Sequence, residues 1–406
     1  MGHIKHLMEM EEARGFYTPP EKNVCSNCFG DYAIKEFIQE ESTSGFCDYC
    51  GKRKRTLIAA PLESVIEFIM EGIRSEWGDP SDEGVGWMSS EGGWIGADVI
   101  DSYDLLSEEI DLQIENEILF SDILDTIFDR QWCRKNPYAL SRHQEWLYDW
   151  ESFSNQVKHQ ARYMFFKIPK RKPIFKFDKE PAPYEILFTL RKMVNRFGLI
   201  KAIEPGTLFI RARSHKKGDQ YTTLKDLGPP PKEKTLSNRM SPAGIVMLYG
   251  ALDKNTAIRE IRDVDPSKTH ITTVAFKVLE PFKVLDLTGL PPVPSLFDSA
   301  TRDNRSSVIF LRSFCYDISK SIEKDDRVHI EYVPTQVVTE YFRLIFRDEK
   351  RKPIKGIIYP SSRLPGGKSC VLFFTSENCT ADGVLEKGAK FWLSMESSTI
   401  RTRKLR

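Results

Sequence analysis

The sequence lacks any hydrophobic run that approaches the roughly 20 residues a helix needs to cross a bilayer. Residues 1–15, MGHIKHLMEMEEARG, are polar and acidic and do not contain the apolar core of a signal peptide. His6 breaks the usual myristoylation pattern. We therefore expect a cytoplasmic protein that does not associate with membranes.

The chain also lacks a net charge of either sign. Its 59 Lys and Arg residues nearly cancel its 58 Asp and Glu residues, which leaves a formal charge of +1 at pH 7. A general nucleic-acid binder carries a clear positive excess, so this balance argues against that class, although a local basic patch is still compatible with it. With 40% hydrophobic and 29% charged residues among 406, the composition is that of a soluble globular protein with two or three domains.

Two phosphate-binding motifs are missing. No GxGxxG follows a strand-like segment, so a Rossmann dinucleotide site is not supported. No GxxxxGK[ST] is present either, so a P-loop is not supported. Any nucleotide chemistry in this chain must rest on other residues.

Eight cysteines are present, and in a long cytosolic chain metal binding or burial explains them better than disulfides. Four of them form the CxxC pairs Cys25–Cys28 and Cys47–Cys50, with residues 29–46 between the pairs. This spacing predicts a tetrahedral zinc site with four thiolates, which has no open coordination position and is therefore structural. The alternative is four unrelated buried or redox cysteines. The basic turn GKRKR at 51–55 could contact phosphate, but a solvated turn is the simpler interpretation.

The pattern becomes helical after Pro61. Apolar residues three and four apart predict a helix over 62–73, and further helices are predicted at 103–129 and 142–166. Between the first two lies a Gly- and Ser-rich loop at 78–96. His159 falls on the last helix beside its apolar face, where a structural histidine is more common than a catalytic one.

The second half of the sequence has a different pattern of predicted elements. Residues 169–185 are rich in Pro and Lys and are predicted to be a linker. A helix is expected at 183–197, and the basic end STIRTRKLR is expected to fray. From Thr207 onward, the strand-like runs LFIRAR, IVMLY, HITTVAFKV, FKVLDL, GIIYP, CVLFF and FWLS alternate with predicted helices at 253–262, 304–322 and 335–347. This mixed order predicts an α+β fold and not a regular doubly wound sheet.

A candidate site is concentrated in residues 208–262. One strand carries Arg211, and a loop with a proline and a glycine carries Arg239. A second strand ends at Tyr249, and a short helix that Asp253 or Asn255 can cap carries Glu260. Guanidinium, phenol and carboxylate groups brought together in this way predict a pocket for an anionic ligand with a reacting centre.

Each of these residues also has a purely structural explanation. Arg211 and Arg213 alternate on a strand, so one of them could face water. Arg239 could be a solvated loop residue, Tyr249 a core residue, and Glu260 part of an exposed charged helix face. Glu340, on a strongly apolar helix, is a competing carboxylate: it is either a pocket residue or a partly buried structural one.

Taken in chain order, these residues resemble the RES-domain family. The resemblance covers about residues 186–395 and rests on Arg211, Arg239 in NRMSPAG, Tyr249, Glu260 in AIREIR and the late Tyr359-Pro360-Ser361-Ser362. It implies a fold like that of ADP-ribosyltransferases and an NAD-consuming toxin that acts by glycohydrolysis or phosphorolysis. The first half resembles the HEPN/RES N-terminal region, with its CxxC pairs and a helix carrying Trp150, Phe153 and VKH..RY at 157–163. The RNase motif of HEPN domains is not convincingly present, so no RNase activity is inferred.

The resemblance also implies a role for each pocket residue. Arg211 and Arg239 would hold the diphosphate of NAD, and Tyr249 would stack on nicotinamide or bond a ribose hydroxyl. Glu260 would bond the nicotinamide ribose and stabilise the cationic transition state as the N-glycosidic bond breaks. Ser361 would orient the ribose or the amide, although Ser362 is not separable from it. The chain departs from the family at Lys368-Ser369-Cys370, where an Asn is often found.

The leading hypothesis is thus an NAD glycohydrolase or phosphorylase, with water or phosphate as acceptor, acting as a toxin or defence effector. An antitoxin or regulatory protein and self-association are further partners that it allows. A nucleotide- or RNA-binding module without turnover and an ADP-ribosyltransferase are the alternatives. The expected domains are a zinc module at 1–60, a helical HEPN-like region at 61–168, a linker at 169–185, a RES domain at 186–395 and a basic tail at 396–406.

Overall fold

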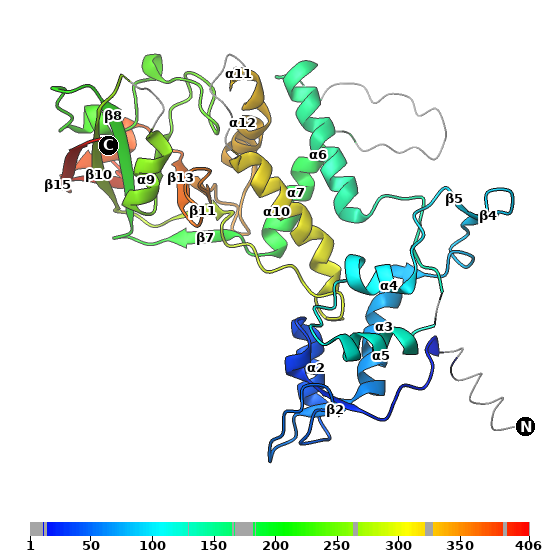
Figure 1. The fold of residues 1–406 in the computed structure, drawn as a ribbon. Coiled ribbons are helices and arrows are strands. Elements are labelled where there is room, and N and C mark those ends of the chain that lie inside the picture. Colours follow the sequence, from blue (N-terminus) through cyan, green and yellow to red (C-terminus); the bar gives the residue numbers. More distant parts are fainter. Residues whose placement is uncertain are drawn as a thin grey trace, which may run out of the picture. The chain divides into compact units, whose positions relative to one another are not determined.

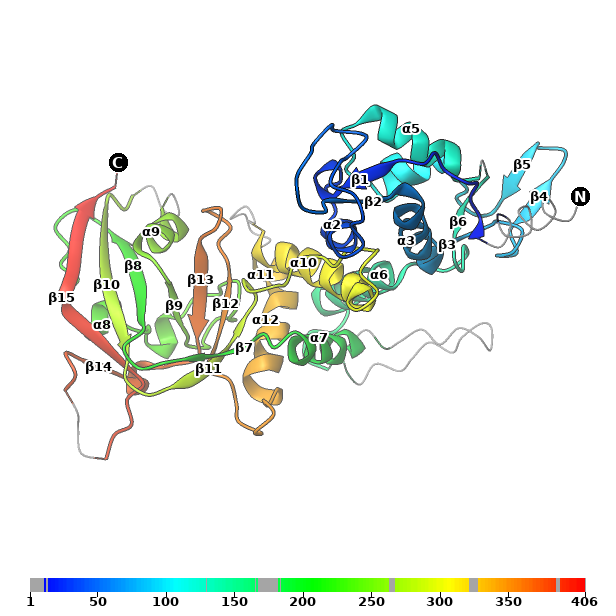
Figure 2. The same ribbon diagram turned by 90° about the horizontal axis from the view of Figure 1, so that it is seen from below.

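The structure is a computed structural model that describes residues 11, 14–128, 130–164, 166, 182, 184–262, 267–320, 328–384 and 388–405. The chain divides into two compact units, one formed by residues 1–142 and 292–308 and the other by 143–291 and 309–406 (Figures 1 and 2). The predicted linker at 169–185 lies outside the described residues except for Ala182, Tyr184 and Glu185. Within the described ranges, no helix has both the length and the apolar character that spanning a membrane requires.

The first unit is mainly helical, as expected. The helix predicted after Pro61 is confirmed as α3, whose apolar stripe is fully buried in the core of this unit. Asp31 caps the preceding helix α2 by accepting hydrogen bonds from the backbone amides of Ala33 and Ile34. The elements of this unit are β1 (Asn23–Cys25), α2 (Tyr32–Glu40), β2 (Ala59–Pro61), α3 (Leu62–Glu76), β3 (Trp77–Gly78), β4 (Gly86–Met88), β5 (Gly93–Ile95), α4 (Ser102–Asp104), a π-helical turn (Leu105–Glu109), α5 (Glu117–Thr126) and β6 (Cys133–Arg134).

Two sequence predictions for this unit were wrong in detail. The helix predicted at 103–129 is interrupted between the π-helical turn and α5, where Asp111 and Gln113 adopt left-handed backbone conformations with φ of 48° and 53°. Asn116 then starts α5 by accepting a hydrogen bond from the amide of Leu119. The predicted loop at 78–96 contains the β4–β5 hairpin.

The second unit is built on a mixed sheet of nine strands in the order β14-β15-β10-β8-β9-β13-β12-β11-β7. The pairs β11–β12 and β14–β15 are parallel, and the other pairs are antiparallel. The strands are β7 (Ile200–Ile203), β8 (Leu208–His215), β9 (Leu248–Ala251), β10 (His270–Val278), β11 (Phe282–Asp286), β12 (Gly356–Pro360), β13 (Lys368–Leu372), β14 (Cys379–Ala381) and β15 (Leu393–Lys404). The helices are α6 (Arg142–His159), α7 (Glu185–Arg196), α8 (Leu224–Leu227), α9 (Lys254–Ile261), α10 (Arg305–Ser319), α11 (Val328–Glu331) and α12 (Val333–Glu340), followed by a π-helical turn (Tyr341–Ile345).

The central strands of this sheet are buried on both faces. Ile357 on β12 packs into a core shared with α6, α7, α10 and α12, whereas the adjacent Ile358 packs into a second core with residues of β8 and β10. Successive side chains of a strand point to opposite faces, so β12 reads as a continuous apolar run. The α+β prediction is therefore confirmed for a helical first unit and a large mixed sheet in the second.

Three boundaries in this unit differ from prediction. β9 begins at Leu248 and continues past Tyr249 to Ala251, so IVMLY is only partly a strand. α6 ends at His159, not at 166. The basic end does not fray within the described residues, because Thr402, Arg403 and Lys404 on β15 pair with β10.

Candidate active site

The site lies where the sheet opens between β8 and β9. The two strands share the single register pair Ile210 and Ala251, after which they separate. Arg211 bridges the opening, because its Nη1 donates a 2.9 Å hydrogen bond to the carbonyl of Tyr249. A side chain thus replaces a ladder hydrogen bond, and this places a charged group in the middle of the sheet.

Arg211 and Arg213 both line the cavity formed at this opening. The expectation that one of them faces water was wrong, because residues two apart on a strand point to the same face. Arg213 donates a 2.9 Å hydrogen bond from Nη2 to the carbonyl of Gly228. Burial, followed by the charge of Arg213, lowers the pKa of Arg211 to about 9 from its ordinary 12.5.

Arg239 lies on the loop before β9 and is fixed at its tip. Its Nη1 donates to the carbonyls of Ile318 at 2.8 Å and Lys320 at 2.6 Å, at the C-terminal end of α10. Its guanidinium also lies 5.6 Å from the centre of the Tyr332 ring. These contacts satisfy end carbonyls of the helix and hold the guanidinium on the cavity wall.

Gln336, a buried residue of α12, forms hydrogen bonds to the same loop. Its Nε2 donates to the carbonyls of Asn238 at 2.8 Å and Ser241 at 3.3 Å. The hydroxyl of Ser241 lies 2.9 Å from that of Tyr249, which connects the loop to β9. Burial raises the pKa of Tyr249, so its phenol stays protonated and can donate a hydrogen bond.

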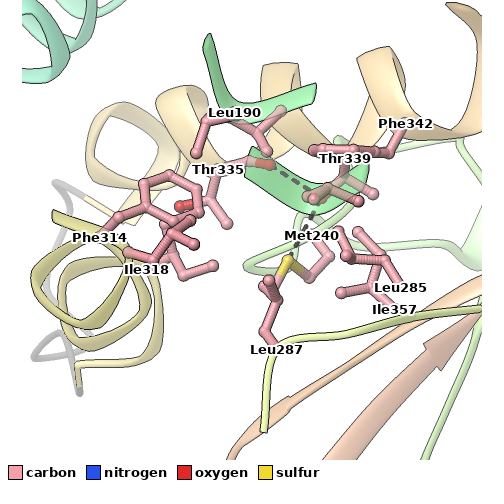
Figure 3. A pocket seen from close by; sticks show the side chains of 13 residues that line it. Leu190, Met240, Leu285, Leu287, Phe314, Ile318, Thr335, Thr339, Phe342 and Ile357 are labelled. Carbon is pink, nitrogen blue, oxygen red and sulfur yellow. Dashed lines mark hydrogen bonds between the residues drawn. The ribbon is translucent and has the colours of Figure 1, made fainter. Parts of the chain in front are cut away.

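Beneath the loop lies a small enclosed apolar cavity of about 10 Å³, lined by Met240, Leu190 and Phe314 among others (Figure 3). Thr339 Oγ1 donates to the carbonyl of Thr335 at 2.8 Å and contacts the sulfur of Met240 at 3.2 Å. This volume is at the limit for a single water, and the nearby hydroxyl is already bonded. The cavity is therefore a packing void behind the site and not a binding site.

Glu260 is presented by α9, which packs against β8, β9, β10 and β13. The predicted cap is confirmed, because Asp253 accepts the amide of Thr256 at 2.9 Å. One carboxylate oxygen of Glu260, Oε1, accepts the hydroxyls of Ser361 at 2.5 Å and Ser369 at 2.9 Å. In the described part of the chain, Oε2 has no hydrogen-bond partner, and Glu260 lines the cavity.

The structure separates the two serines that sequence could not. The hydroxyl of Ser361 donates to Glu260 and accepts the amides of Arg363 and Leu364, each at 3.2 Å. Ser362, by contrast, is among the residues that line the cavity. Ser361 therefore holds Glu260, whereas Ser362 lies on the cavity wall.

The cavity has a volume of about 570 Å³, enough for a ligand of nucleotide size. Arg211, Arg239, Tyr249 and Glu260 all line it, so four of the predicted residues meet in one place. Glu340 ends α12 and His159 is exposed at the end of α6; neither is among the lining residues.

Among the polar residues that line this cavity are several to which the sequence assigned no role, including Arg213, Ser241, Tyr332, Tyr359 and Ser369. Ser369 belongs to the segment Lys368-Ser369-Cys370, where the sequence departs from the resemblance, and this departure was the available signal. Arg213 lies two residues from Arg211 on the same strand, so strand alternation was the signal for it. Ser241, Tyr332 and Tyr359 reach the cavity through tertiary contacts.

The four CxxC cysteines of the first unit also come together, with all four sulfurs within 4.8 Å of one another. The Sγ–Sγ distances are 3.8 Å for Cys25–Cys28, 3.5 Å for Cys25–Cys50 and 3.7 Å for Cys28–Cys47. Burial alone would raise the pKa of Cys47, but backbone amides of Cys50, Tyr49 and Cys25 outweigh it and lower the pKa. Such a cluster could hold a metal ion.

Comparison with known protein families finds two matches. Residues 208–396 match the RES domain, and residues 40–171 match the HEPN/RES N-terminal domain 1. None of the curated proteins matches the chain. RES domains are associated with NAD-related toxin activity, which indicates an NAD-processing enzyme. The chain therefore carries a RES domain preceded by a HEPN/RES N-terminal domain 1.

Proposed function

We propose that the second unit cleaves the bond between nicotinamide and ribose in NAD. The observation that carries this proposal is how the carboxylate of Glu260 is hydrogen-bonded. Two serine hydroxyls bind one of its oxygens, which leaves the other oxygen for a ligand. The buried Arg211 and the half-buried Arg239 line the same cavity. A carboxylate beside an anomeric carbon stabilises the positive charge that develops as the glycosidic bond breaks. Arg211 and Arg239 would bind the diphosphate, and Tyr249 would contact the nicotinamide ribose.

The reaction balances without a further cofactor. As the N-glycosidic bond breaks, its electron pair stays with nicotinamide and neutralises the pyridinium. An oxygen of water then bonds to the anomeric carbon, giving ADP-ribose and releasing one proton to solvent. With phosphate as acceptor, a phosphate oxygen forms that bond instead, and the product is ADP-ribose 1″-phosphate.

The likeness of this unit to ADP-ribosyltransferases and its role as a toxin or defence effector belong to the same proposal. Support comes from the RES match and from the pocket chemistry, since loss of NAD harms the cell in which it occurs. A neutralising protein partner would then be required while the protein is present in an active form.

We further propose that the four-cysteine cluster binds zinc in a structural, zinc-ribbon-like site. A regular tetrahedron with Zn–S bonds of about 2.3 Å has S–S edges of about 3.8 Å. The observed sulfur distances of 3.5, 3.7 and 3.8 Å fit this value. Four protein thiolates fill the coordination sphere, so Cys25, Cys28, Cys47 and Cys50 would stabilise the fold of the first unit and take no part in catalysis.

The test is nicotinamide release from NAD by the full-length protein, with and without inorganic phosphate, compared with Glu260→Gln. The amide oxygen of Gln can still accept both serine hydroxyls, so this variant removes the charge and keeps the geometry. Glu280→Gln, an exposed carboxylate in the turn between β10 and β11, is the matched control. Release by wild type and control but not by Glu260→Gln is expected; equal release by all three would refute the assignment of Glu260.

A further inference from the structure

Arg213 has no part in the function proposed above, yet it lines the same cavity as Arg211. The two residues lie on one face of β8 and are both largely desolvated, Arg211 being only 8% exposed. The Nε atom of each is buried and has no hydrogen-bond partner among the described residues. Each of these arginines therefore contains a buried donor whose hydrogen-bonding capacity is not met by the described residues.

This pair is unfavourable in the empty protein. Neither arginine forms an ion pair with a carboxylate in the described part of the chain, and each repels the other. The charge of Asp226 acts on Arg213, but the Asp226 Oδ2 accepts the hydroxyl and the amide of Thr223. Two buried like charges without a counter-ion cost free energy, and an anion that binds between them removes this cost.

The charges of the residues that line the cavity also favour an anionic ligand. Among the described residues that line the cavity, five arginine and lysine side chains, Arg211, Arg213, Lys234, Arg239 and Arg363, outnumber the carboxylate of Glu260 even without Lys268. NAD carries two negative charges on its diphosphate and one positive charge on nicotinamide. The excess of positive charge on the wall is therefore larger than NAD alone would balance.

We propose that Arg213, together with Arg211, forms a subsite for a phosphate group additional to the diphosphate of NAD. This inference rests on the proposed function and deepens it. Two sources share the chemistry: the 2′-phosphate of NADP, and inorganic phosphate as the acceptor of the cleavage. In the second case a phosphate oxygen bonds to the anomeric carbon while the glycosidic electron pair leaves with nicotinamide.

The experiment uses the full-length protein in phosphate-free buffer and has two kinetic arms. The first compares kcat/KM for NADP and NAD; the second measures the rate on NAD against inorganic phosphate concentration. Arg213→Gln and Arg213→Lys are compared with wild type, and Arg259→Gln, an exposed residue of α9 outside the cavity, is the control. We expect Arg213→Gln to lower either the NADP/NAD ratio or the apparent affinity for phosphate by about 10- to 100-fold, with a smaller loss for Lys.

Calorimetric titration of inorganic phosphate and NADP into wild type, Arg213→Gln and Arg213→Lys adds a readout that does not depend on turnover. Weaker binding by both variants supports the subsite even if wild type releases no nicotinamide, in which case only the proposed reaction fails. If the variants and wild type agree in both kinetic arms and in titration, the subsite is refuted while NAD cleavage stands. Should Arg213→Gln not fold, Arg213→Lys decides, because it keeps a charge and loses the planar fork.

Discussion

Ser369 donates a 2.9 Å hydrogen bond to Glu260, on the same carboxylate oxygen that accepts the hydroxyl of Ser361 at 2.5 Å. These two donors fix the rotation of the carboxylate, and its second oxygen has no hydrogen-bond partner among the described residues. Ser369 lies on β13 and Ser361 just after β12, so two neighbouring strands of the sheet position the side chain of one helix.

Ser369→Ala and Ser361→Ala are expected to lower kcat for nicotinamide release by about 10- to 100-fold, with a smaller effect on KM. Each removes one hydrogen bond to a charged group, which is worth about 1.5–3 kcal/mol. Steady-state kinetics measures the separate effects on kcat and KM. Thermal melting shows whether each variant also loses stability. Ser361→Ala should also lower Tm, because the amides of Arg363 and Leu364 lose their acceptor.

Ser394→Ala is the matched control for these variants, since Ser394 is equally buried on β15 but accepts from Gly383 away from the cavity. If Ser369→Ala changed kcat no more than Ser394→Ala does, Ser369 would have no positioning role.

Ser362→Ala should behave differently from Ser361→Ala. Ser362 lines the cavity without contacting Glu260, so its hydroxyl is available to the ligand in the ground state as well as in the transition state. Loss of such uniform binding raises KM and leaves kcat nearly unchanged. Steady-state kinetics on NAD checks this, and a loss of kcat as large as that of Ser361→Ala would reverse the assignment of the two serines.

Ligand binding is expected to weaken as pH rises through about 9, the value to which burial and the neighbouring Arg213 lower the pKa of Arg211. The charged form binds the anion, and above its pKa the charged fraction falls about tenfold per pH unit. The sign for stability is opposite. The folded pKa lies below the ordinary 12.5, so the charge destabilises the folded chain at neutral pH, and this cost is relieved between about 9 and 12.5.

Titration of NAD into Glu260→Gln between pH 7 and 10 measures this dependence without turnover. In the double variant that also carries Arg211→Met, binding should be weak at every pH and should lose the step near pH 9. A step that persists in the Arg211→Met background would assign it to another group.

Removal of metal is expected to unfold the first unit. Cys25→Ser, or a strong zinc chelator, should abolish the bound metal and a thermal transition, since structural zinc contributes folding free energy directly. Metal analysis should find one zinc per wild-type chain. Cys133→Ser is the control, because Cys133 is a buried thiol of the same unit outside the cluster. Retention of zinc by Cys25→Ser would contradict a four-thiolate site.

Much of the fold follows from local pattern. The predicted strands GIIYP and HITTVAFKV have the same bounds as β12 and β10. Uninterrupted apolar and β-branched runs favour a strand that is buried on both faces. The cap at Asp253 and the CxxC cluster were likewise readable, since each depends on residues close in sequence. The break at Asp111 was not, because the helical spacing of Leu106, Ile110 and Ile114 continues across it.

The candidate site divides in the same way. Residue types and their order were enough to single out Arg211, Arg239, Tyr249 and Glu260 as one group and the four cysteines as another. Tertiary structure alone decided which serine holds Glu260 and that Ser369 assists it. The reason is that these contacts join residues about a hundred positions apart, across strands whose neighbours are set by sheet topology, and no local periodicity records which strand lies next to which.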